Sequence, residues 1–128
     1  MAPRSRRMQR LDELLRQEIA RLIAEEVRDP RVGFTTVMDA RVSPDLRHAR
    51  VYVSVLGDDR EKEAAVDALR RASGFLRGRL GAIVEMKYLP ELEFELDRSL
   101  ERASRIEEIL GRVRPPEQPD DESPGEEP

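Results

Sequence analysis

Two stretches of the chain gather arginines with no acidic residue among them. The first ten residues contain Arg4, Arg6, Arg7 and Arg10, and residues 68–84 contain Arg70, Arg71, Arg77 and Arg79. An arginine side chain presents a planar set of N–H donors that fits the oxygens of a phosphate group. These stretches therefore predict binding to a polyanion such as nucleic acid.

The overall charge of −4 conceals this local basic character. Residues Pro115–Pro128 carry six acids and no base, and the rest of the chain has 23 bases against 21 acids. The bases are nearly all arginine, which a GC-rich genome explains as well as phosphate binding does. The position of the arginines is therefore more informative than their number.

Residues that could support catalysis are scarce. The only histidine is His48, there is no cysteine, and neither a phosphate-binding glycine loop nor a metal-ligand spacing of acids is present. We expect no enzymatic activity, no cofactor and no metal. The lack of cysteine fits a reducing compartment, and no apolar run approaches the roughly 20 residues of a membrane-spanning helix. We therefore expect a cytoplasmic protein without membrane contact.

Hydrophobic periodicity indicates the elements that position the arginines. Apolar residues at three- and four-residue steps predict a helix over residues 8–27, after a flexible basic arm at 1–7. Asp29 and Pro30 end this helix. Alternating runs at 34–42 and 48–55 around a turn signal, SPDL at 43–46, predict an antiparallel hairpin. A third strand is expected within residues 84–97.

The second arginine stretch lies on a helical pattern over residues 60–83 that Gly74 interrupts. Glycine costs about 1 kcal/mol relative to alanine in a helix, and Ser73 can bond its own backbone. We therefore predict two helices that meet at a kink. A helix that restarts after Gly74 would point free N–H groups outward, which favours an anion.

The predicted fold is α+β, in the order α-β-β-α-(kink)-α-β with a short C-terminal helix from Ser99 to about Leu110. The folded domain covers residues 8–112. Residues 113–128 are expected to form a disordered acidic tail, because they lack the apolar surface that would offset chain entropy. The phenylalanines Phe34, Phe75 and Phe94 are expected in the core. The tyrosines Tyr52 and Tyr88 are candidates for stacking on a base.

Five short motifs follow one another along the chain: DPRVGF at 29–34, VSPDLRHA at 42–49, VYVSV at 51–55, GFLR at 74–77 and LPELEF at 89–94. In this order and spacing, the chain resembles the ribosome-binding factor A family over residues 6–110. The resemblance implies a type II KH-like fold and a non-catalytic factor, monomeric when free. It also implies binding to the immature 30S ribosomal subunit and its 16S rRNA late in maturation, with support of rRNA processing and of growth after cold shock.

The resemblance also implies where RNA binds. KH domains clamp nucleotides with a Gly-x-x-Gly loop, and this family carries Ala-x-Gly at the kink, present here as Ala72, Ser73 and Gly74. We interpret the Gly-x-x-Gly pattern at 78–81 as a coincidence. The RNA-binding hypothesis thus comprises Arg70, Arg71, Ala72, Ser73, Gly74, Arg77 and Arg79, with a second contact at Arg28 and Arg31.

Three alternatives remain open at this point. The α-helical arginines could form a solvated face with no partner, and Arg28 and Arg31 could serve only the carbonyl groups at the end of the first helix. The protein could instead be an interaction module that docks on a ribosomal protein or another assembly factor through the acidic strand Glu91–Asp97.

Overall fold

The computed structural model describes residues 4–86 and 88–99. Its elements are α1 (Arg6–Glu26), the 3₁₀ helix η1 (Pro30–Val32), β1 (Thr35–Val42), β2 (His48–Val55), α2 (Asp59–Ile83) and β3 (Glu91–Leu96). The chain divides into two compact units, Met1–Asp97 and Arg98–Pro128, and all of these elements belong to the first. The expected C-terminal helix beyond Ser99 and the acidic tail lie outside the described residues.

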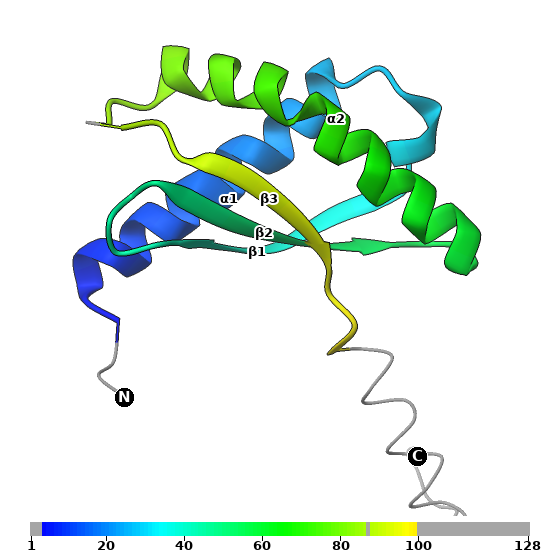
Figure 1. The fold of residues 1–128 in the computed structure, drawn as a ribbon, viewed down its shortest axis with the longest axis horizontal. Helices are drawn as coiled ribbons and strands as arrows, with labels where there is room; N and C mark the ends of the chain where they lie inside the picture. Colours follow the sequence, from blue (N-terminus) through cyan, green and yellow to red (C-terminus); the bar gives the residue numbers. More distant parts are fainter. Residues whose placement is uncertain (1–3, 87, 100–128) are drawn as a thin grey trace, which may run out of the picture. The chain divides into compact units, whose positions relative to one another are not determined.

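The three strands form one sheet in the order β1-β2-β3. β1 and β2 make the predicted antiparallel hairpin, and β3 joins β2 in parallel after the chain has crossed over through α2. Both helices lie on the same face of the sheet (Figure 1). Alternate strand residues are accordingly buried beneath the helices and exposed on the open face. The mixed α+β class expected from the sequence is confirmed.

A β-bulge at Met38 changes which residues of β1 face the core. Val37 pairs with Val53 and Asp39 pairs with Tyr52, so Met38 is an extra residue. A bulge reverses the alternation of side chains along a strand. Val37 is therefore buried, whereas Phe34 is 74% exposed. The expectation that Phe34 belongs to the core was wrong for this reason.

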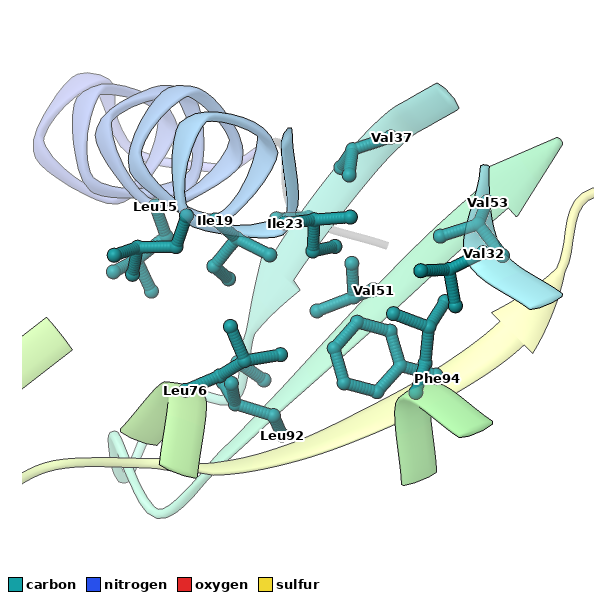
Figure 2. Close-up of a cluster of buried hydrophobic side chains, with 14 of the residues drawn as sticks. Leu15, Ile19, Ile23, Val32, Val37, Val51, Val53, Leu76, Leu92 and Phe94 are labelled. Atoms are coloured by element: carbon teal, nitrogen blue, oxygen red, sulfur yellow. The ribbon is translucent and has the colours of Figure 1, made fainter. Parts of the chain in front are cut away.

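The core lies between the two helices and the covered face of the sheet. Leu15, Ile19 and Leu22 from α1 meet Leu76 from α2 and Phe94 from β3, and all are at most 1% exposed. Figure 2 shows several of these side chains converging from the two helices and the sheet around Val51. Burial of one such side chain contributes roughly 1.5–3 kcal/mol. Phe94 was correctly assigned to the core, but Phe75 is half exposed.

The expectation of two helices that meet at Gly74 was wrong, because α2 is one helix from Asp59 to Ile83. Its axis bends near the middle in Figure 1, but the ribbon is continuous. Glycine keeps its backbone N–H, so its cost of about 1 kcal/mol weakens a helix without breaking it. Leu69, Leu76 and Leu80 on the buried face outweigh that cost. Ser73 donates its hydroxyl to the Arg70 carbonyl at 2.8 Å within the intact helix.

The ends of the helices follow the capping signals in the sequence. Asp58 caps α2 in a reciprocal capping box with Glu61. α1 ends at Glu26, where Val27 becomes extended, and Pro30 then opens η1. None of the helices in the described part of the chain is long and apolar enough to cross a membrane.

Candidate nucleic-acid interface

The outward side of α2 carries the candidate residues Arg70, Arg71 and Gly74, which are all exposed. Gly78 lies one turn after Gly74 on the same side. A Cβ atom added at either glycine would meet nothing within 4 Å. The two arginines therefore stand beside a strip of bare helix backbone, which we call the α2 glycine strip (Gly74 and Gly78).

Continuity of α2 changes the mechanism that this strip can offer. A helix that restarted after Gly74 would present unpaired N–H groups, and the structure has no such second N-terminus. The expectation that kink N–H groups hold an anion was therefore wrong. α2 can instead present arginine side chains to a phosphate, beside the α2 glycine strip, where no side chain obstructs the approach.

The four candidate arginines of α2, which are Arg70, Arg71, Arg77 and Arg79, differ in the hydrogen bonds and ion pairs that they already make. Arg77 donates two hydrogen bonds to the Leu89 carbonyl, at 3.1 and 2.7 Å. Arg79 donates to the carboxylate of Glu26 at the end of α1, at 2.7 and 3.0 Å. Arg70 lies 3.6 Å from Asp67, and both side chains are more than half exposed. Arg77 and Arg79 thus hold parts of the fold together, while Arg70 is only weakly held.

Among the four candidate arginines, Arg71 is the one with no side-chain hydrogen bond or ion pair to residues 4–86 and 88–99. It lies close enough to Asp29 to help lower the pKa of that carboxyl group. The main cause of this lowering, to about 2, is the hydrogen bonding of Arg31 through its side chain and its backbone N–H. Arg71 therefore lies within electrostatic range of the carboxylate that Arg31 binds.

Arg28 and Arg31, the proposed second contact, lie on either side of Asp29. The Arg31 guanidinium donates to the Asp29 carboxylate, with one distance of 2.9 Å, and Asp29 also accepts from the Arg31 backbone N–H. Arg28 is exposed and has no such partner within residues 4–86 and 88–99. The Asp29 carboxylate is thus within electrostatic range both of Arg71 on α2 and of the proposed second contact at Arg31.

The remaining candidates are structural or shielded. Ala72 is half-buried and packs against the core. In the Gly-x-x-Gly pattern, both glycines lie inside α2 and not in a loop. A Cβ at Gly81 would come within 2.6 Å of the end of the Leu89 side chain, which would have to move aside. Arg47 lies over the Tyr88 ring, 5.3 Å from its centre, so that face of Tyr88 is covered.

The first arginine stretch is part of the folded structure. α1 begins at Arg6, two residues earlier than expected. Arg4, which we expected in a flexible arm, donates to Asp12 at 2.6 and 2.8 Å and to the Val42 carbonyl at 2.6 Å. The position of Asp12 on the inward side of a basic helix was the signal that sequence reasoning missed.

The architecture is that of a small mixed α+β protein found in solved ribosome-binding factors. The crystal structure of ribosome-binding factor A from Thermus thermophilus has a TM-score of 0.65 and 34% sequence identity, covering 72% of this chain and 98% of that one. A Thermotoga maritima solution structure described as a putative ribosome binding factor A has a TM-score of 0.59 at 34% identity, covering 79% and 95%.

Sequence comparisons assign the family. The family model for ribosome-binding factor A matches residues 7–110. Ribosome-binding factor A of Halothermothrix orenii is 47% identical over 91% of this chain and 95% of its own length. That of Thermomicrobium roseum is 46% identical over 91% of each. The chain belongs to the ribosome-binding factor A family.

Proposed function

We propose that this protein is a non-catalytic assembly factor that binds the immature 30S subunit and its 16S rRNA through a KH-like domain. In this role it supports late maturation and rRNA processing, including in the cold. Family membership supports the proposal. So does a structural relative, a homology model of the Thermus thermophilus factor fitted into a cryo-EM map of a 30S complex, which has a TM-score of 0.58.

The observation that carries the RNA-contact part of the proposal is the pairing state of the arginines beside the α2 glycine strip. A phosphate competes poorly for a guanidinium that already has an internal acceptor, as Arg77 and Arg79 do. Arg70 and Arg71 are better placed to give their donors to RNA. The bare helix backbone at Gly74 lets the sugar-phosphate backbone of an RNA come close to α2, because no side chain stands in the way.

This division suggests a test with matched charge changes. The double variant Arg70→Gln/Arg71→Gln should bind purified 30S subunits more weakly, and its log–log salt slope should shrink by about 1–2. The variant Arg77→Gln/Arg79→Gln removes the same charge and should retain more of the affinity. Equal effects of the two variants would show that net charge, and not this site, governs binding. Wild-type affinity in the first variant would contradict the proposed contact.

A second candidate function is docking on a ribosomal protein or another assembly factor. The acidic strand considered for this role is partly engaged already, since Glu93 lies 2.9 Å from His48 and Glu95 lies 3.1 Å from Arg50. A different feature favours protein docking: Phe34 and Leu56 are about three-quarters exposed at the rim of a hollow of about 300 Å³. Binding that is insensitive to salt and lost in Phe34→Ser would support this alternative.

A further inference from the structure

Three arginines at the start of α1 have no partner in the described structure. Arg6, Arg7 and Arg10 are exposed, and no ion pair or side-chain hydrogen bond joins them to residues 4–86 or 88–99. They occupy the first two turns of the helix, on its outward side together with Leu14. We call this group the α1 basic surface (Arg6, Arg7 and Arg10).

Other arginines on the same helix are neutralised locally. Arg16 is paired with Glu13, and Arg21 is paired with Glu18 and Glu25 at 3.1 and 3.0 Å. These pairs stand three or four residues apart, the spacing at which side chains on a helix meet. The α1 basic surface has no acid at such a spacing other than Glu13, which is held by Arg16 and Gln17.

The position of the α1 basic surface is also unfavourable for the helix itself. The N-terminal end of a helix carries a partial positive charge, so acids stabilise it and bases destabilise it. The first turn of α1 contains no acid, whereas the first turn of α2 contains Asp59 and Glu61. Intramolecular stability therefore does not account for three arginines here.

The segment is held firmly despite this local repulsion. Arg4 is bonded to the buried Asp12 and to the β1 carbonyl of Val42, which ties the residues before α1 to the sheet. Ser5 caps the helix by accepting from the Met8 N–H at 3.1 Å. The α1 basic surface is thus a fixed group of charges and not part of a loose terminus.

We infer that the α1 basic surface contacts RNA phosphates, as a contact separate from those proposed at Arg71 and at Arg28 and Arg31. Three arginines within two turns can meet successive phosphates of one strand, and each is free to donate a pair of hydrogen bonds. Because α1 has 21 residues, its start lies about 30 Å from the end that leads to Arg28. An RNA that touched both the α1 basic surface and Arg28 would therefore have to span the length of α1, either as one segment or as two segments of a folded RNA. This inference rests on the proposed function.

The test compares two variants of the full chain. Arg6→Gln/Arg7→Gln/Arg10→Gln should bind purified 30S subunits and protein-free 16S rRNA at least tenfold more weakly at low salt, with a log–log salt slope smaller by about 2–3. The control Arg16→Gln/Arg21→Gln lies on the same helix but removes arginines with internal partners. Its affinity should stay within about twofold of wild type.

Thermal unfolding supplies an independent readout. The triple variant should melt at the same temperature as wild type or higher, because it removes repulsion at the helix start. A lower melting temperature would overturn the inference, since the arginines would then serve the fold or bind another part of this chain. So would unchanged affinity, or equal losses in the control.

Two further outcomes separate the ligand and the underlying function. Weaker binding to 30S subunits with unchanged binding to protein-free 16S rRNA would overturn the RNA assignment in favour of an acidic protein. If wild type binds neither probe, the proposed function fails. If wild type binds and only Arg70→Gln/Arg71→Gln is impaired, the proposed function stands and the α1 contact fails.

Discussion

Arg79 of α2 and Glu26 of α1 form a two-pronged ion pair that joins the two helices across 53 positions of sequence, at 2.7 and 3.0 Å. The pair lowers the pKa of Glu26 and raises that of Arg79, chiefly through these hydrogen bonds. An arginine that the sequence marked as an RNA contact is therefore engaged by the fold. Its neighbours Arg70 and Arg71 have no comparable tie within the described residues.

The first prediction compares Arg79 with Arg71. Arg79→Gln should lower the melting temperature only slightly, because an exposed ion pair contributes little to stability. It should change the affinity for 30S subunits by less than about twofold, because Arg79 already gives its donors to Glu26. Arg71→Gln should leave the melting temperature unchanged and weaken binding several-fold. Scanning calorimetry and a binding titration on both variants check this. The reverse pattern would contradict the assignment of roles.

The second prediction concerns two glycines of α2. Gly74→Ala should stabilise the protein by about 0.5–1 kcal/mol, because a methyl group there meets nothing and alanine favours the helix. Gly81→Ala should gain less stability than Gly74→Ala, because its Cβ would approach the end of the Leu89 side chain to 2.6 Å and that side chain must move aside. Urea unfolding measures both. If Gly74→Ala also weakens 30S binding while raising stability, the bare backbone serves the ligand.

The third prediction concerns Asp12, which is 8% exposed and accepts from Arg4 and from the Val42 N–H at 2.9 Å. Asp12→Ala should cost about 2 kcal/mol or more, since it leaves the buried Val42 N–H without an acceptor and the Arg4 guanidinium without its carboxylate. The half-exposed Asp39, 3.6 Å from Arg41, offers a control in Asp39→Ala with a smaller expected loss. Equal losses in urea unfolding would argue against a special role for Asp12.

The fourth prediction is a dependence on pH at η1. The pKa of Asp29 is about 2, below its ordinary value of 3.8, because Arg31 bonds the charged carboxylate. A lowered pKa means that this contribution is complete above about pH 4 and is lost as the pH falls towards 2. Carboxyl chemical shifts followed by NMR should place the Asp29 midpoint near 2. Arg31→Gln should move that midpoint back up, and a wild-type midpoint near 3.8 would refute the contact.

Helix ends, the hairpin and one core residue could be predicted from the sequence, because nearby residues determine them. Asp29 and Pro30 marked the end of α1, because proline acts within a few residues. The SPDL turn placed the hairpin correctly. Phe94 was assigned to the core from simple alternation, and the structure confirms it at 1% exposure.

Prediction failed where distant contacts decided the outcome. No local pattern marked the bulge at Met38, so the inward-facing residues before it were assigned to the wrong face. Gly74 was expected to divide α2 into two helices, but the buried leucines on either side keep the helix continuous. The partners of Arg77 and Arg79 are a carbonyl 12 residues away and a carboxylate on another helix. Separating free arginines from occupied ones therefore required the structure.

The parallel pairing of β3 with β2 bears on how the chain folds during its own synthesis. Phe94, the largest of the fully buried side chains, reaches the core only when β3 pairs with β2, which requires that the whole of α2 has already been synthesised. α1, the hairpin and α2 must therefore leave the translating ribosome before their shared core can close. Such late, long-range closure slows folding. We expect nascent chains arrested before residue 91 to remain sensitive to protease.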